Sequence, residues 1–487
     1  MKFRRVLLFV FVMIFMTGTL STEAATTQSS PALEPWTKGV IDWGTGTFLG
    51  QHVSIDHYER NGRAYISYYD ATHGNLKLAY EVSPGTGNCP GNADWKCDTV
   101  DSGFIFMGDS HDVGQYSSID VIDDTTTWVL PQGDLNLAPI LYHYAKIGIS
   151  YYDDTDNALK FALWSCESSN SCSWAITEID DDTGTFPDSI GQYSSFHFGS
   201  DDTPVIYYRQ YNSLSSSGKV RQAYLTGTFS GHCGAGWHCE TVAQSLTVTA
   251  YGTHISADGN SVAYYDGGSD QLMLATPSGT GYGSGCGITN YWNCVVIDNG
   301  GLFGDVGKFV SLHAGDASHP TQMAYYDAVK GKVKYAVGTT GTGNCTNNNF
   351  NCFAVDTIGT TTLPGNIGLS MTMDLEGAPI IAYQDFSDEQ GPAALKIARP
   401  AGVYGNVAGN CGEVPPGPDN LFLFWQCKFL DAGQYSEMAD YAAVSVSPAG
   451  LATVAYYEFA TLGDYSEVGR LKVAQQHFTV QLPLIMK

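Results

Sequence analysis

The chain has 487 residues, of which 55 are glycine and 30 tyrosine, and only 15% carry a charge. Its formal net charge is −26, which argues against polyanionic partners such as nucleic acids and anionic membranes. This glycine- and tyrosine-rich composition indicates one large all-β body with many turns rather than several small domains.

The first 24 residues have the pattern of a secretory signal peptide. Three basic residues precede the apolar run Val6–Met16, and a small-residue cleavage site lies at Ala24. The apolar run is too short to span a bilayer comfortably. We therefore predict a secreted, extracellular protein without a membrane span.

The remainder is expected to form one domain. Residues 25–35 are predicted to be a short disordered leader and residues 36–487 a single folded body. Removal of residues 1–24 leaves 20 basic and 48 acidic residues, a net charge of −28. The acidity fits solubility, and also a salty medium, a cationic partner or bound calcium.

A heptad with a glycine, a polar residue, a ring and a serine recurs along the chain. It reads "GQHVSID" at Gly50–Asp56, "GQYSSID" at Gly114–Asp120, "GQYSSFH" at Gly191–His197 and "GTHISAD" at Gly252–Asp258. Each copy is followed by an apolar segment of the "ISYYD" type, then by a segment of the "LKLA" type. Period-2 alternation with β-branched and aromatic residues predicts strands.

A fourth segment, of the type "WKCDTVD", closes six units, whereas the other three segments occur seven times. The missing seventh copy is "WTKGVID" at Trp36–Asp42, ahead of the first heptad. This offset predicts a seven-bladed β-propeller of four-stranded antiparallel blades, closed when the N-terminal strand joins the C-terminal blade. One alternative stays open, because "HFTVQL" at His477–Leu482 competes for the closing position.

The "ISYYD" repeats resemble those of secreted bacterial propellers in the sialidase-like and lectin-like group. The resemblance covers nearly all of the predicted mature chain and implies a fold. The sialidase Asp-box is absent and arginines are few, so the resemblance does not imply sialidase activity.

The twelve cysteines fall into six local pairs, each bracketing the connection between the third and fourth strands of a blade. The protein is predicted to be exported, and its cysteines are even in number and recur at the same place in each blade. These features predict disulfides rather than zinc sites. The predicted pairs are Cys89 with Cys97, Cys166 with Cys172, Cys233 with Cys239, Cys286 with Cys294, Cys345 with Cys352, and Cys411 with Cys427.

The candidate ligand site is the rim where the first strands begin. The blades are aligned on Ser54, Ser118, Ser195, Ser256, Ser311, Ser370 and Ser445. Two positions earlier stand His52, Tyr116, Tyr193, His254, Phe309, Gly368 and Ala443. One position before those stand Gln51, Gln115, Gln192, Thr253, Lys308, Ile367 and Ala442. Hydrogen-bonding groups and rings in blades 1–4 predict a pocket there, with packing between blades as the alternative role.

Arg209 is a further candidate, because it replaces the acid of "YYD" in the third blade alone. The acids of the other blades are expected to cap the turns that follow them. The predicted ligand-binding set is Gln51, His52, Gln115, Tyr116, Gln192, Tyr193, Arg209, His254 and Lys308.

A metal site is a further prediction. The connection Asp101–Gly114 offers Asp109, His111 and Asp112 as candidate ligands. We expect no cofactor, with calcium as the alternative.

The function that this pattern favours is non-catalytic recognition of a carbohydrate by a monomeric extracellular protein. Rings can stack on sugars, and amides can hydrogen-bond to their hydroxyl groups. A protein-binding scaffold is an alternative, with an extracellular protein as its partner.

Two enzymatic alternatives remain. A polysaccharide lyase would use His52 as base, Tyr116 or Tyr193 as acid and Arg209 or Lys308 to neutralise a uronate. A glycoside hydrolase would use two carboxylates of the rim, drawn from Asp70, Asp153, Asp266 and Asp327.

Overall fold

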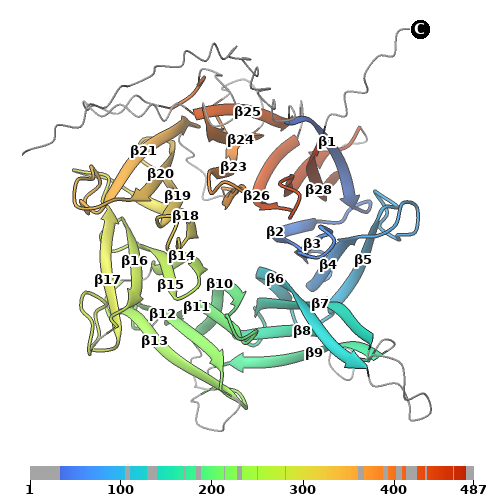
Figure 1. Ribbon diagram of the computed structural model, residues 1–487, viewed down its shortest axis with the longest axis horizontal. Coiled ribbons are helices and arrows are strands. Elements are labelled where there is room, and N and C mark those ends of the chain that lie inside the picture. Colours follow the sequence, from blue (N-terminus) through green and yellow to red (C-terminus); the bar gives the residue numbers. More distant parts are fainter. Residues whose placement is uncertain are drawn as a thin grey trace, which may run out of the picture.

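The computed structural model contains seven four-stranded antiparallel sheets arranged as a ring (Figure 1). It describes residues 33–104, 110–128, 140–168, 171–181, 188–212, 214–226, 233–248, 250–279, 281–359, 367–387, 393–401, 409–412, 425–433, 436–463 and 466–478. The predicted seven-bladed propeller is confirmed. Among these residues, no helix is long and apolar enough to cross a membrane.

Each blade contributes four consecutive strands, except the last. Blade 1 consists of β2 (Leu49–His57), β3 (Ala64–Asp70), β4 (Asn75–Glu81) and β5 (Trp95–Asp101). Blade 2 consists of β6 (Val113–Trp128), β7 (Ile140–Asp153), β8 (Ala158–Ser168) and β9 (Ser171–Asp180). Blade 3 consists of β10 (Ser189–Phe198), β11 (Pro204–Asn212), β12 (Ser217–Leu225) and β13 (Trp237–Ser245). Blade 4 consists of β14 (Tyr251–Asp258), β15 (Ser261–Asp266), β16 (Gln271–Pro277) and β17 (Trp292–Asp298).

The remaining blades follow the same order. Blade 5 consists of β18 (Val306–His313), β19 (Gln322–Asp327), β20 (Lys332–Gly338) and β21 (Phe350–Thr357). Blade 6 consists of β22 (Leu369–Met373), β23 (Pro379–Asp385), β24 (Ala394–Pro400) and β25 (Trp425–Ala432). Blade 7 consists of β26 (Ser436–Val446), β27 (Ala452–Thr461), β28 (Glu467–Phe478) and β1 (Leu33–Asp42).

The ring is closed by the N-terminal strand, as the sequence predicts. β1 pairs antiparallel with β28 from Leu33↔Phe478 to Asp42↔Leu471 (Figure 1). His477 and Phe478 belong to β28 itself, so the competing segment does not displace β1. β1 begins at Leu33 and so includes the last three residues of the segment 25–35 that was expected to be a leader. The signal-peptide prediction lies outside the described residues.

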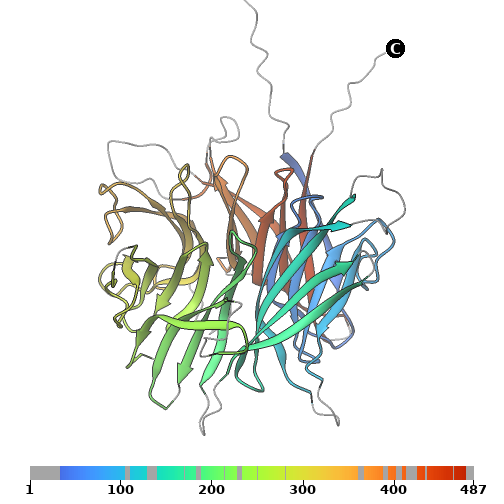
Figure 2. The same ribbon diagram turned by 60° about the horizontal axis from the view of Figure 1, so that its bottom comes forward.

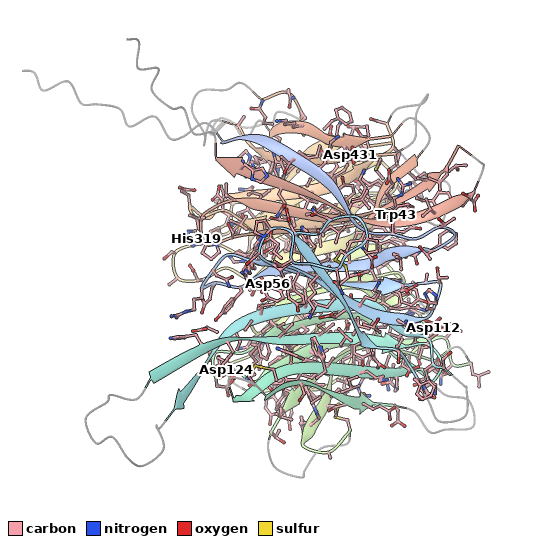
Figure 3. All side chains as sticks on the ribbon, turned by 90° about the vertical axis from the view of Figure 1, so that its right-hand side faces the viewer. Trp43, Asp56, Asp112, Asp124, His319 and Asp431 are labelled. Atoms are coloured by element: carbon pink, nitrogen blue, oxygen red, sulfur yellow. A yellow bond between two sulfur atoms is a disulfide. The ribbon has the colours of Figure 1, made fainter. Side chains whose placement is uncertain are left out.

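The strands run between two faces of the ring (Figure 2). The first strands start on one face, which we call the mouth face, together with the turns between second and third strands. The disulfide-bonded loops lie on the opposite face, which we call the disulfide face. In blade 1, for example, Glu81 pairs with Trp95 at this end of the sheet, and the loop between them contains Cys89. In Figure 3, Trp43 and Asp112 lie toward the mouth face, and Asp124 and His319 toward the other.

All six predicted disulfides are present, and each closes a loop inside a single blade. The bonded pairs are Cys89 with Cys97, Cys166 with Cys172, Cys233 with Cys239, Cys286 with Cys294, Cys345 with Cys352, and Cys411 with Cys427. Their sequence separations are 6 to 16 residues. The cysteines are therefore structural, and disulfides of this kind fit an oxidising compartment.

A buried tyrosine, lysine and aspartate join neighbouring blades. The first tyrosine of "YYD" and the basic residue of "LK" bind the aspartate that ends the outermost strand of the preceding blade. The aspartates with their partners are Asp42 (Tyr68, Lys77), Asp101 (Tyr151, Lys160), Asp180 (Tyr208, Arg221), Asp298 (Tyr325, Lys334), Asp356 (Tyr383, Lys396) and Asp431 (Tyr456, Lys472).

Blade 4 departs from this triad in a concerted way. Ala243 takes the place of the aspartate and Met273 that of the lysine, so both charges are missing together. The Tyr264 hydroxyl instead lies 3.0 Å from that of Tyr251. The substitution avoids leaving one buried charge without a partner.

Candidate functional site

In blades 1, 2, 3 and 5 the heptad glycine lets the first strand approach the preceding blade closely. Gly114 has φ +108°, and a Cβ atom there would lie 2.8 Å from Cα of Leu76 in β4. Gly50, Gly191 and Gly307 meet Leu471, Leu159 and Leu272 in the same way. Glycine is required because any side chain would collide with a neighbouring backbone.

The ring residue two positions later adopts a left-handed backbone conformation. In blades 1–5 these residues are His52, Tyr116, Tyr193, His254 and Phe309, with φ between +50° and +54°. The register of the first two strands shifts on both sides of this position, which marks a β-bulge. Bulky residues seldom adopt positive φ, so this repeated strain is a feature that the surrounding fold imposes.

The aligned serines are structural. Six of them accept a hydrogen bond from a main-chain N–H of another blade, as Ser54 Oγ does from Ile119 at 3.2 Å. In the last of these pairs, Ser370 Oγ accepts from Val444 at 3.2 Å. In the other five pairs the donating residue directly follows the aligned serine of its own blade. Val444 follows Ala443, so Ala443 occupies the serine position of blade 7.

The alignment of blade 7 on Ser445 is therefore wrong by two residues. The ring position belongs to Tyr441 instead of Ala443, and the preceding polar position to Asp440 instead of Ala442. Ser445 has another role, since its Oγ lies 2.9 Å from Nδ1 of buried His57. The sequence pattern failed here because the serine that marks the register is itself replaced in this blade.

Six rings form an arc around the central channel, which we call the collar. Successive ring centroids are 4.2–5.1 Å apart and the ring planes are tilted by 45–60°. In order the members are Tyr441, His52, Tyr116, Tyr193, His254 and Phe309. The second tyrosine of "YYD" supports several members edge-on, as Tyr69 does for His52 with centroids 6.0 Å apart.

The collar lines a pocket of about 190 Å³ at the centre of the propeller. All six rings are half-buried, as expected of side chains that line an open channel. The pocket is also lined by Gly368 of blade 6 and Asp440 of blade 7. It is smaller than the roughly 300 Å³ at which drug-sized sites begin.

Burial keeps the collar uncharged. It lowers the pKa of His52 to about 3. Burial, together with the positive charges of Lys308 and Arg209, lowers the pKa of His254 to about 3. Burial likewise raises the pKa of Tyr116 and Tyr193 above the ordinary value for tyrosine. At neutral pH the pocket therefore presents neutral rings.

The other predicted ligand residues hydrogen-bond to protein neighbours. Gln115 Nε2 donates to Asp112 at 3.4 Å, and Lys308 Nζ donates to Asp305 at 2.6 Å. Gln51 contacts the hydroxyl of Tyr457. Thus His52, Tyr116, Tyr193 and His254 line the pocket. The side chains of Gln51, Gln115 and Lys308 instead bind neighbouring residues of the protein.

Arg209 is a buried link between blades 3 and 4. Its Nη1 donates to Gln192 Oε1 at 2.9 Å and its Nε to the Tyr251 carbonyl at 3.3 Å. Its guanidinium carbon lies 4.5 Å from the ring centroid of Tyr211. Because β11 is extended past Arg209, the turn is capped by Asn212, which accepts from the Ser215 N–H at 2.8 Å.

The acids of "YYD" cap their own turns, as predicted. Asp70 and Asp153 each accept from main-chain N–H groups two and three residues later. Asp266 and Asp327 do the same for Gly268 and Lys330. Their hydrogen bonds give these carboxylates a structural role, which does not favour the glycoside-hydrolase alternative.

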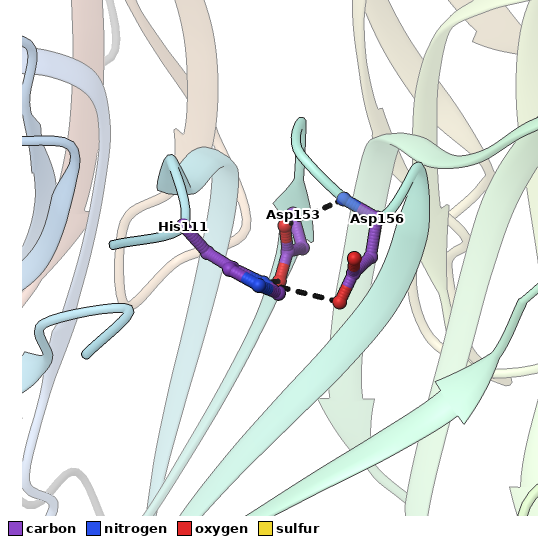
Figure 4. A group of neighbouring side chains, drawn as sticks. All are labelled: His111, Asp153 and Asp156. Atoms are coloured by element: carbon purple, nitrogen blue, oxygen red, sulfur yellow. Dashed lines mark hydrogen bonds and ion pairs between the residues drawn. The ribbon is translucent and has the colours of Figure 1, made fainter. Parts of the chain in front are cut away.

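His111 lies with Asp153 and Asp156, and not with the predicted partners Asp109 and Asp112. Its Nδ1 lies 3.1 Å from carboxylate oxygens of both Asp153 and Asp156 (Figure 4). Asp112 instead accepts from the Tyr69 hydroxyl at 2.6 Å, and Asp109 lies outside the described residues. Since Lys160 Nζ is 3.6 Å from Asp153 Oδ2, the cluster already has a protein cation, and three ligands are few for calcium.

Comparisons with known proteins find only distant structural similarity. No family model matches the sequence, and no curated protein matches it. The GH93 alpha-L-arabinofuranosidase of Fusarium graminearum aligns with 7% identity and a TM-score of 0.39 over 90% of this chain and 97% of that one. The parainfluenza virus 5 hemagglutinin-neuraminidase ectodomain aligns with 8% identity and a TM-score of 0.35 over 92% and 85%. The S. cerevisiae core factor aligns with 7% identity and a TM-score of 0.41 over 93% and 62%.

Proposed function

We propose that this protein is a secreted, non-catalytic propeller that binds a carbohydrate at the collar. The observation that carries the proposal is a continuous arc of six half-buried rings lining a pocket of about 190 Å³. Aromatic faces bury apolar surface and carry a polarised π-system, both of which suit the C–H faces of a sugar. Tyrosine and histidine also offer hydrogen-bonding groups at the edge of each ring.

The protonation behaviour of the collar favours binding over elimination. A general base works best when its pKa is near the operating pH, whereas burial holds the pKa of His52 at about 3. Arg209, the candidate for neutralising a uronate, is buried and hydrogen-bonded to Gln192 and to the Tyr251 carbonyl. We therefore do not favour the lyase alternative.

The proposal is tested by calorimetric titration with a panel of short neutral, acidic and amino-sugar oligosaccharides. We expect at least one class to bind to the wild-type protein, and Tyr116→Ala to abolish that binding. Tyr291→Ala is the matched control, because Tyr291 is 63% exposed and precedes Trp292 in a disulfide-bonded loop on the opposite face.

Two results would contradict carbohydrate binding at the collar. One is the absence of binding across the whole panel. The other is equal affinity in the wild type and Tyr116→Ala, which would move the site elsewhere. An increase in ultraviolet absorbance on incubation with polyuronates would instead support the lyase alternative.

A further inference from the structure

The collar has a gap at blade 6 that the backbone enforces. Gly368 stands at the ring position, where the other blades carry an aromatic or imidazole side chain. A Cβ atom at Gly368 would lie 2.1 Å from the carbonyl oxygen of Ala439 in the blade 7 bulge. No ring fits there, so the gap is a fixed part of the pocket wall.

Hydrogen-bond acceptors gather at this gap. Gln384 occupies the place of the second tyrosine of "YYD", and its Nε2 donates to Asp440 Oδ1 at 2.5 Å. This bond fixes the orientation of the amide, because a carboxylate can only accept. The other amide atom, Gln384 Oε1, is buried and has no hydrogen-bond partner among the described residues; Gln384 itself is only 1% exposed.

Gln384 therefore orients Asp440, and its burial keeps its own amide out of reach of a ligand. Asp440 lines the pocket, and its carboxylate oxygens have acceptor capacity beyond the bond from Gln384. Asp440 can therefore accept a hydrogen bond from a ligand in the pocket, and a carboxylate favours a positively charged donor.

The charge distribution around the pocket points the same way. Lys308, on the blade 5 side, is paired with Asp305 at 2.6 Å, whereas Asp440 has Glu437 as a charged neighbour. Aromatic rings attract cations through their faces, and the six rings line the same pocket as this acid. A hard metal ion is a poor fit, because calcium requires six to eight oxygen ligands.

We propose that the bound sugar carries a protonated amino group, as a glucosamine unit does, and that this ammonium binds Asp440, which Gln384 holds in place, while the sugar ring packs on the collar. The inference rests on the proposed carbohydrate function and specifies its ligand class. The net charge of −26 would also attract such a cationic saccharide from a distance.

The test compares glucosamine disaccharides with their fully N-acetylated counterparts by calorimetry. Acetylation removes the charge but keeps the sugar ring, so we expect the acetylated form to bind about 10- to 100-fold more weakly. Asp440→Asn should weaken binding of the amine by a similar factor and leave the acetylated form nearly unchanged. Glu59→Gln, an equal charge change at an exposed position on the disulfide face, should alter neither.

Gln384→Leu provides a second variant, which removes the hydrogen bond that positions Asp440 without changing charge. We expect it to fold and to lose most of the preference for the amine. Tyr116→Ala should abolish binding of both saccharides, which separates the pocket from general attraction to an acidic surface.

Equal affinity for the two saccharides, or an amine preference that survives in both Asp440→Asn and Gln384→Leu, overturns this inference while carbohydrate binding stands. If neither saccharide binds but a neutral or acidic one in the wider panel does, the ligand class is wrong and the function is kept. If no saccharide binds, both proposals fail.

Discussion

The hydroxyl of Tyr325 donates a hydrogen bond to Oδ2 of Asp298 at 2.7 Å, linking blade 5 to the outermost strand of blade 4. Lys334 binds the same carboxylate oxygen. Burial alone would raise the pKa of Asp298, but Lys334 and hydrogen bonds from Tyr325 and the Gly300 N–H lower it below the ordinary value. The contact between blades therefore depends on a charged pair.

Removal of one member of this triad should destabilise the fold strongly. Asp298→Ala leaves Lys334 without its buried partner, for which we expect a loss of about 3 kcal/mol in the free energy of unfolding. The double variant Asp298→Ala with Lys334→Met copies the apolar arrangement of Ala243 and Met273, and should recover at least about half of that loss. Urea unfolding measures both, and a double variant less stable than the single one would contradict the explanation.

The heptad glycines should be sensitive to the smallest side chain. Gly114→Ala places a methyl group 2.8 Å from Cα of Leu76, so we expect a loss of more than about 3 kcal/mol or no folded protein. Gly85 also has positive φ, at +75°, but has no atom within 4 Å of the added group. Gly85→Ala should therefore cost only about 1 kcal/mol, and similar losses in the two variants would refute the close-approach argument.

At the ring positions with a left-handed backbone, asparagine should be more stable than valine, the opposite of the order in an ordinary strand. At Tyr193, where φ is +53°, asparagine tolerates the conformation and valine does not. We expect Tyr193→Val to be less stable than Tyr193→Asn by about 1 kcal/mol, although valine is more apolar. At exposed Thr99 in β5 the order should reverse, because valine favours ordinary strands. The same order at both positions would argue against backbone strain at the collar.

Stability should decline as the pH falls below about 6.5, the ordinary pKa of histidine. Burial lowers the pKa of His52 and His254 to about 3 and that of His57 to about 4. Between these values and 6.5 the unfolded chain binds protons that the folded one does not, so acid favours unfolding.

Replacing one of these histidines should make that decline less steep. The measurement is the urea midpoint of wild type and His52→Gln between pH 7 and about pH 4. His73→Gln is the control, because the His73 side chain is 60% exposed. An unchanged slope in His52→Gln, or an equal change in His73→Gln, would show that burial of the collar imidazole is not the cause.

Much of the fold follows from the sequence because its signals are local and repeated. Seven segments of the "YYD" type mark the seven blades. The offset of Trp36–Asp42 and the six cysteine pairs lead to the correct closure and disulfides. The triads were missed, although their residues recur at fixed places in nearly every unit. Pairing between blades becomes visible only when the outermost strand of one blade is placed beside the next.

The site was predicted less completely, for a physical reason. The collar rings of blades 1–5 were aligned correctly because a serine marks the register in each. In blade 7 the serine position is occupied by Ala443. A shift of two residues preserves strand alternation, so alignment on Ser445 does not identify Tyr441 and Asp440 as site residues. The bond between Gln384 and Asp440 joins residues 56 positions apart, and depends on the relative heights of two neighbouring blades.

Closure by β1 also sets an order on biosynthesis. The first strand of the ring to be made, Leu33–Asp42, finds its sheet partner in the last, Glu467–Phe478. During elongation the nascent chain can complete blades 1 to 6 one after another, yet the main-chain groups of β1 stay without their sheet partner until β28 has been made. Prematurely terminated products therefore carry two open edges, which are templates for association with other chains. Closure of the ring therefore depends on the 12 residues of β28.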